Sequence, residues 1–134
     1  MHSQIFVNLP IADMARSRVF FQALGYSFDP RFSNDQGAAV VLGDNLYAML
    51  LVHDFFQTFT DKPVADATRS TEVLVCLACD SREHVDALVA KAVAAGGKAP
   101  RPVQDHGFMY GHGFEDLDGH IWEFVHMSGM PPQQ

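Results

Sequence analysis

The side chain in this sequence with the clearest capacity for chemistry is a carboxylate near the C-terminus, Glu123. It stands in the segment 120–127, where odd-numbered and even-numbered residues of a strand would point to opposite faces. We expect the even positions Trp122 and Phe124 to pack against a helix, which sends Glu123 into a cavity. A carboxylate in a largely apolar cavity would have a raised pKa and could serve as a general base. The alternative is a structural carboxylate held by hydrogen bonds.

A second group of reactive side chains lies in the segment 105–113, which is dense in glycine, histidine and aromatic residues. Tyr110 and His112 fall on one face of the expected strand, although the sequence alone does not say which face. On the face of Glu123, His112 would be a second catalytic group or metal ligand, and Tyr110 would contact a bound molecule. The alternative is that both are polar groups at a strand end, because two side chains alone bind a metal ion weakly.

Two cysteines, Cys76 and Cys79, have the spacing of a C-x-x-C motif. They stand in an apolar run that we expect to be a strand, where residues three apart point to opposite faces. The two thiols therefore cannot readily share a metal ion or a disulfide. We predict that both are buried structural cysteines.

The composition excludes several classes of protein. The chain has 134 residues, 48% of them hydrophobic and 19% charged, which is usual for a globular domain and argues against disorder. Its formal net charge of -7, with its basic residues scattered, argues against a nucleic-acid partner. No segment approaches the roughly eighteen apolar residues that span a bilayer, and the N-terminus lacks a signal-peptide pattern. We expect no membrane partner and a cytoplasmic location.

The elements that would position these side chains follow one order twice along the chain. In the first half we expect a strand over Gln4–Leu9 ended by Pro10, then a helix capped by Asp13 and stopped by Gly25. Three further strands are expected over Tyr26–Phe32, Ala38–Leu42 and Leu46–His53, with a hairpin turn at Gly43–Asn45. A polar connector with a short helical turn at Phe55–Phe59 follows.

The second half begins with a strand over Thr71–Cys79 and a helix capped by Asp80, with Glu83 completing a capping box. That helix ends at Gly96-Gly97. Strands are expected over Lys98–Val103, Gly107–Glu115 and His120–Met127, with a turn at Asp116–Gly119 between the last two.

The repeated order of elements predicts the fold class. We expect a single α+β domain over residues 1–134, built from two paired βαβββ modules at about 4–60 and 71–128. One helix would cover one face of each small sheet. The other faces would together form a curved half-barrel, a cup of the kind that binds small molecules.

Two stretches at opposite ends of the chain carry a family resemblance. The opening stretch from Phe6 to Gly25 contains a strand, an apolar-x-Asp step, Ser-x-x-Phe-Phe and Leu-Gly. The closing stretch from Asp116 to Glu123 reads Asp-x-Asp-Gly-x-x-x-Glu. With the matching order of elements between them, the chain resembles the vicinal-oxygen-chelate superfamily of glyoxalases, bleomycin resistance proteins and extradiol dioxygenases. The resemblance implies a homodimer.

Metal-dependent members of that family hold a divalent ion with four side chains, usually His, Gln or Glu, one from each of four strands. Carried over to this sequence, the four positions fall on Phe6, on Met49 or Leu50, on Leu74 and on Glu123. Only Glu123 matches the family's ligand types. The resemblance therefore predicts that the usual metal site is absent, so that no metal or other cofactor is expected.

The function expected from these positions is metal-free binding of a small, aromatic or cationic molecule in an apolar cup. The expected ligand contacts are these: Phe6, Asn8, Leu50, Leu74 and Tyr110. Asn8 shares a strand face with Phe6, where it would orient a polar ligand group or satisfy backbone groups. The alternative is a glyoxalase-like lyase or isomerase, or a dioxygenase, with a displaced divalent metal site formed by Glu123 and a histidine.

Overall fold

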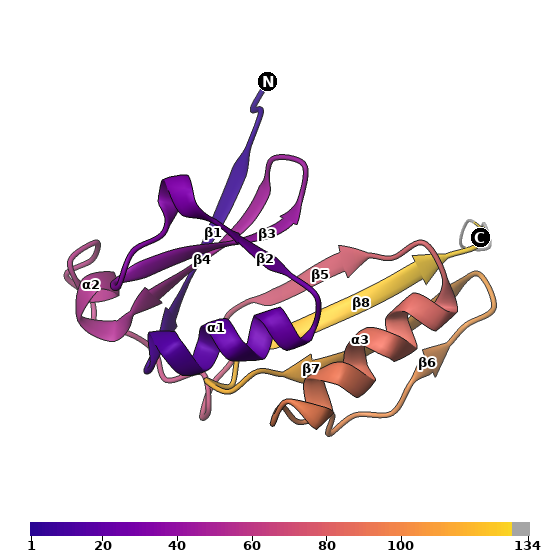
Figure 1. Cartoon of the computed structure of the whole chain (residues 1–134). Helices are drawn as coiled ribbons and strands as arrows, with labels where there is room; N and C mark the ends of the chain where they lie inside the picture. The colour runs from indigo at the N-terminus through magenta and orange to yellow at the C-terminus, as the bar shows by residue number, and fades with distance from the viewer. Residues whose placement is uncertain (130–134) are drawn as a thin grey trace. The chain divides into compact units, whose positions relative to one another are not determined.

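The computed structural model describes residues 1–129, and the chain divides into two compact units, Met1–Asp66 and Ala67–Gln134. Each unit contains one four-stranded mixed sheet, with the strand order β1-β4-β3-β2 in the first and β5-β8-β7-β6 in the second (Figure 1). The two orders are the same when each unit is counted from its own first strand. The predicted α+β class with two βαβββ modules is confirmed.

The first unit is built around a sheet that we call sheet 1. Its elements, in chain order, are β1 (Ile5–Ile11), α1 (Met14–Ala23), β2 (Ser27–Asp29), a 3-10 turn η1 (Pro30–Phe32), β3 (Gly37–Gly43), β4 (Leu46–Val52) and α2 (His53–Gln57). Strand β1 is parallel to β4, whereas the pairs β3–β4 and β2–β3 are antiparallel. Helix α1 packs on β3 and β4.

The ends of α1 follow the predicted signals. The Asp13 carboxylate accepts a hydrogen bond from the Arg16 backbone N–H at 3.0 Å, which satisfies a donor that the first helical turn leaves unpaired. Gly25, with φ of +102°, has the left-handed conformation that favours glycine after a helix. Phe20 and Phe21 are buried between these ends, so the amphipathic pattern of the segment does place α1 over the core.

Two strand ends in this unit differ from the predictions by more than one residue, and a proline lies at each of them. Strand β1 continues through Pro10 to Ile11, because β1 is an edge strand, where a missing backbone donor costs little. Strand β2 stops at Asp29, and residues Pro30–Phe32 form the 3-10 turn η1 instead of extending it. The fixed φ of proline suits the first position of such a turn.

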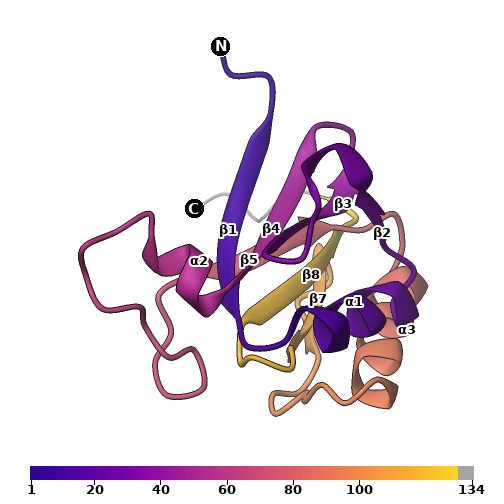
Figure 2. The ribbon, with the colours of Figure 1, turned by 60° about the vertical axis from the view of Figure 1, so that its left-hand side comes forward.

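The second unit is built around sheet 2 and repeats this plan. Its elements are β5 (Leu74–Ala78), α3 (Arg82–Ala94), β6 (Gln104–Asp105), β7 (Met109–Glu115) and β8 (Ile121–Met127). Helix α3 lies along β7 and β8 (Figures 1 and 2). Trp122 and Phe124 of β8 are fully buried, as the alternation of that segment predicted.

Two predictions for the second unit were wrong. The cap of α3 is Ser81, whose Oγ accepts from the His84 backbone N–H at 3.0 Å, and not Asp80 with a capping box to Glu83. The segment 98–103 is not a strand: only Lys98 bridges to Glu115, and the strand β6 begins at Gln104. Pro100 and Pro102 lack the N–H groups that a continuous ladder needs.

The turn between β7 and β8 is organised by the buried carboxylate of Asp116. Its Oδ1 accepts from the backbone N–H groups of Asp118 at 2.9 Å and His120 at 3.0 Å, and its Oδ2 accepts from Trp122 Nε1 at 3.0 Å. Burial raises the pKa of the Asp116 carboxyl, against the lowering effect of His120 and of these donors. One carboxylate thus fixes both the turn and the largest core side chain of the unit.

Gly119 completes this turn with φ of +90°. A Cβ at this position would lie 2.8 Å from backbone atoms of Ala67 and Thr68, closer than such atoms approach in proteins. Glycine is therefore required here both for the turn and for the close passage of the segment that opens the unit.

Within residues 1–129, no helix has the length and apolar character that crossing a membrane requires.

We predict that Asp116→Asn lowers the free energy of unfolding by about 1–3 kcal/mol, because an amide cannot accept from all three donors at once. Urea unfolding followed by the fluorescence of Trp122, the single tryptophan, measures this change. Asp44→Asn, at the exposed hairpin turn between β3 and β4, is the matched control and is expected to change little. Equal stability of the two variants would contradict the role given to Asp116.

Candidate functional site

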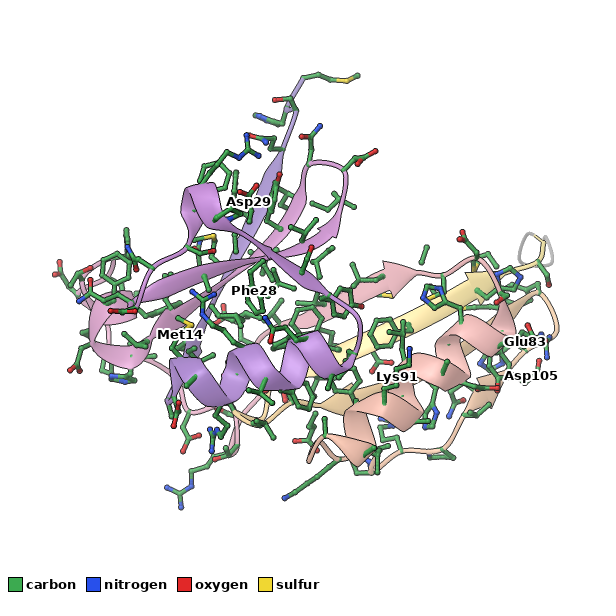
Figure 3. All side chains as sticks on the ribbon, in the orientation of Figure 1. Met14, Phe28, Asp29, Glu83, Lys91 and Asp105 are labelled. Carbon is green, nitrogen blue, oxygen red and sulfur yellow. The ribbon has the colours of Figure 1, made fainter. Side chains whose placement is uncertain are left out.

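Strand register divides the side chains of sheet 1 between two faces. The guanidinium of Arg18, on α1, lies over the ring of Phe28 at 5.1 Å, which places Phe28 on the α1 side (Figure 3 labels Phe28). Its neighbours in register across the sheet are Val40, Ala48 and Val7, so these also face α1. Residues one position along each strand lie on the face opposite α1.

The face opposite α1 carries the predicted contact residues Phe6 and Asn8 together. In register with them on β4 stand Tyr47 and Met49, which share this face. Leu50, in contrast, pairs with Leu9 on the α1 side and is fully buried. Leu50 is therefore on the other face from Phe6 and Asn8. Of the two positions weighed for the family's second metal ligand, Met49 is the one beside Phe6 and Asn8.

Three aromatic side chains meet on this face, and we call them the aromatic cluster: Phe6, Phe32 and Tyr47. The rings of Phe6 and Tyr47 are stacked, with centroids 4.9 Å apart and an interplanar angle of 9°. Phe32 meets them edge-on, with its centroid 5.5 Å from that of Phe6 and 6.0 Å from that of Tyr47. Tyr47 is buried, whereas Phe6 and Phe32 are 37% and 39% exposed. Phe6 and Phe32 therefore expose aromatic surface to solvent beside the buried Tyr47.

An ion pair borders the aromatic cluster where β2 passes into η1, at Asp29 (labelled in Figure 3). Arg31 donates to both carboxylate oxygens of Asp29, the shortest contact being 2.7 Å from Nη2 to Oδ2. Its guanidinium also lies over the Phe32 ring, 5.1 Å from the centroid. Hydrogen bonds from Arg31 hold the pKa of Asp29 below its usual value.

The register of sheet 2 places Glu123 on the face opposite α3. It stands between Cys76 on β5 and Gly113 on β7. A Cβ at Gly113 would lie 2.9 Å from Glu123 Oε2 and 2.6 Å from the Trp122 carbonyl oxygen. The Glu123 carboxylate therefore occupies space that any side chain larger than that of glycine at position 113 would fill. In the sequence, the only sign of this close approach is a glycine inside a strand.

Tyr110 and His112 lie on the other face of the same sheet. Tyr110 donates from its hydroxyl to Asp86 on α3 at 2.6 Å, and His112 pairs in register with the buried Phe124. His112 Nε2 is 2.9 Å from the Arg101 carbonyl oxygen. His112 and Tyr110 therefore do not share the face of Glu123, and their expected roles in catalysis and ligand binding stay predictions.

The histidines on the strands of sheet 2 do not share the face of Glu123. Both histidines of strands β5 to β8, His112 and His126, stand at positions on the α3 side. Within residues 1–129, no group of three or more His, Cys, Asp or Glu side chains could hold a metal ion. The family's four positions, taken unit by unit, are Phe6 with Met49 and Leu74 with Glu123, a set with a single carboxylate. This donor set does not fit a divalent ion of the family's usual kind.

The two cysteines are free, but only Cys79 is buried. Cys76 is exposed on the face of Glu123, so the expectation that both thiols are buried was wrong for this residue. Partial burial raises the pKa of Cys76, and the neighbouring charge of Glu123 raises it further. Leu74, the first residue of β5, is exposed on the same face.

The sequence reasoning missed Tyr47 and Arg31 and did not place Phe32 in a site. Alternation along the segment 46–52 puts Tyr47 on the face of Met49, and this signal was available. The position of Arg31 was not, because it depends on the 3-10 turn that begins at Pro30.

Comparison with known proteins gives related folds and one family. Residues 4–43 match the family model described as bleomycin resistance protein-like N-terminal. No curated protein matches the chain. A solved structure of a hypothetical protein from S. aureus is 28% identical, with a TM-score of 0.78, 93% of this chain and 94% of that chain being covered.

Two further solved structures share the fold at lower identity. A glyoxalase-related enzyme from Fulvimarina pelagi is 21% identical, with a TM-score of 0.80 over 99% of this chain and 94% of its own. A glyoxalase/bleomycin resistance protein/dioxygenase family enzyme from Burkholderia phytofirmans PsJN is 16% identical, with a TM-score of 0.74 over 91% and 96%.

We predict that Gly113→Ala destabilises the protein by about 1–3 kcal/mol and displaces the Glu123 side chain, because the added methyl group overlaps both Glu123 and the Trp122 carbonyl. Gly111→Ala on the same strand is the control, since its Cβ would meet its nearest atom at an ordinary 3.4 Å. Chemical denaturation compares the two variants. Similar losses in both would show that the space beside Glu123 is not restricted.

We predict that iodoacetamide labels Cys76 and spares Cys79, as peptide mass spectrometry would show. Because the thiolate is the reactive form and the pKa of Cys76 is raised, its labelling rate should still be rising above pH 9. Glu123→Gln removes the second cause of the raised pKa and should increase the rate at pH 8 about twofold. Glu83→Gln on α3 is the control (Figure 3). An unchanged rate in Glu123→Gln would contradict the proximity of the two groups.

Proposed function

We propose that the chain is a member of the vicinal-oxygen-chelate superfamily of glyoxalases, bleomycin resistance proteins and dioxygenases, and that it binds a small planar molecule without a divalent metal ion. Its fold and the family model that residues 4–43 match support the first part of this proposal. The observation that carries the proposal is the aromatic cluster on the face opposite α1.

The aromatic cluster suits a planar ligand because of how its rings are arranged. Tyr47 covers one side of the Phe6 ring in a parallel stack, and Phe6 retains more than a third of its exposure. A planar molecule on the exposed side of Phe6 would continue the stack, an arrangement that aromatic rings favour. Phe32 packs edge-on against both Phe6 and Tyr47 and so helps to hold the two stacked rings in place.

The chemistry of the same face supports binding without a metal ion. Phe6 offers no donor atom, and Met49 offers only a thioether, which is a ligand for soft metals and not for the ions that chelate oxygen. Asn8 pairs in register with Met49, follows Phe6 on the same face of β1 and is exposed, so it can orient a polar group of the ligand. Homodimer formation and a cytoplasmic location remain proposals.

Glu123 is compatible with a general-base role, but no second reactive group for that role stands beside it except the Cys76 thiol, within the part of sheet 2 that the structure describes. An enzymatic activity that pairs Glu123 with His112 is therefore not proposed.

We predict that 2-naphthamide, a neutral planar probe, binds the protein in isothermal titration calorimetry with the same affinity in EDTA as without it. Phe6→Ala should weaken binding about three- to tenfold, by loss of one stacked aromatic pair. Val19→Ala, at an exposed valine of α1, is the matched control and should bind normally.

Melting curves with nickel, zinc, manganese and iron(II) complete the test of the metal-free proposal. We expect no shift with any of the four ions. A stabilisation that Glu123→Gln abolishes, or probe binding that requires the metal, would overturn metal-free binding. No binding of the planar probe would overturn the proposed ligand class.

A further inference from the structure

We propose that Arg31 makes the aromatic cluster selective for planar molecules that carry a negative charge, so that the ligand class is an aromatic carboxylate. This inference rests on the proposed function and adds the charge of the ligand to it. The argument depends on the position of Arg31, on the donors that its ion pair leaves, and on the local balance of charge.

Two contacts hold the guanidinium of Arg31 beside the aromatic cluster. Its Nε and Nη2 groups form a fork on the Asp29 carboxylate, and its plane lies over the Phe32 ring. Asp29 is itself held, because its Oδ1 accepts the Arg31 backbone N–H at 2.9 Å as the cap of the turn η1. A charged group fixed in this way loses little side-chain entropy when a ligand binds.

The fork on Asp29 uses one edge of the guanidinium and leaves the other. Arginine has five N–H donors in a plane, and the Nε–Nη2 edge that binds Asp29 does not include Nη1. The Nη1–Nη2 edge matches the geometry of a carboxylate, which it can bind with two parallel hydrogen bonds. The Arg31 side chain is 69% exposed, so this edge is accessible, whereas that of Asp29 is only 10% exposed.

Phe32 connects the charge to the stacking surface. It contacts both Arg31 and Phe6, so the guanidinium lies close to the place where a ring would stack on Phe6. The charged and polar groups around Arg31 are Asp29 and the Tyr47 hydroxyl; each raises the pKa of Arg31, with Asp29 the larger cause. The guanidinium is therefore charged at neutral pH.

The local charge at this place outweighs the charge of the whole chain. The net charge of -7 alone would favour a cationic ligand by long-range attraction. At contact distance, however, the exposed charged group beside the aromatic cluster is the Arg31 guanidinium. The neighbouring Asp29 carboxylate is largely buried and already paired with it. Contact geometry decides specificity, whereas net charge affects mainly the rate of encounter.

Three isosteric probes with one ring system test the inference: 2-naphthoate, 2-naphthamide and 2-naphthamidine, with charges of about -1, 0 and +1 at neutral pH. We expect 2-naphthoate to bind the wild-type protein about fivefold more tightly than 2-naphthamide, as for an exposed ion pair, and 2-naphthamidine to bind more weakly than both. The preference should shrink as salt is raised. Calorimetry measures all three affinities.

Variants separate the role of Arg31 from a structural one. Arg31→Gln should bring the ratio of the 2-naphthoate and 2-naphthamide affinities to about one, whatever its effect on the binding of both probes. Asp29→Asn, which frees the guanidinium from its partner, should increase the preference. Arg82→Gln is the matched control, because Arg82 also forms a two-point ion pair, with Asp105 through Nη1 and Nη2, and lies over the Tyr110 ring on α3's side of sheet 2. A merely structural ion pair would change the melting temperature without changing the order of the probes.

The outcomes distinguish this inference from the proposed function. If the three probes bind equally and Phe6→Ala weakens all of them, the inference is overturned and planar binding stands. If 2-naphthamidine binds most tightly, the inference is overturned in favour of a cationic ligand. If no probe binds, both proposals are overturned.

Discussion

The physical constraint on which the rest of this molecule depends is that each four-stranded sheet has one helix lying on one of its faces. Alternate side chains of a strand point to opposite faces, so covering one face commits half of every strand to the core. The side chains buried in this way include Val40, Ala48 and Leu50 of sheet 1 and Trp122 and Phe124 of sheet 2. Only the side chains on the uncovered face of each sheet remain available for binding or catalysis. A difference of one position along a strand therefore decides whether a side chain can reach a ligand.

That constraint explains which parts of the fold the sequence could predict. Alternation in β8 separated Glu123 from Trp122 correctly, and local capping chemistry placed the start of α1 at Asp13. These signals are local, so they need no knowledge of the neighbouring strands. The cap of α3 was misplaced by one residue, because Asp80 and Ser81 are both good capping residues and only the geometry distinguishes them.

The candidate site was predicted less well, because it depends on register between strands. His112 and Glu123 belong to different strands, and no local pattern says that their positions in register fall on opposite faces. The ambiguity between Met49 and Leu50 had the same origin. Segment 98–103 failed for another reason: its two prolines remove the donors that a strand needs.

The two units repeat one topology but differ in chemistry at equivalent places. On the faces opposite α1 and α3, Met49 of β4 has the place that Glu123 has on β8, and Ala39 of β3 has the place of Gly113 on β7. The carboxylate in the second unit therefore comes with a glycine neighbour, whereas the thioether in the first stands beside a methyl group. For protein engineering, this pairing means that grafting a carboxylate onto position 49 is a two-residue operation, since Ala39 would need to become glycine in the same design.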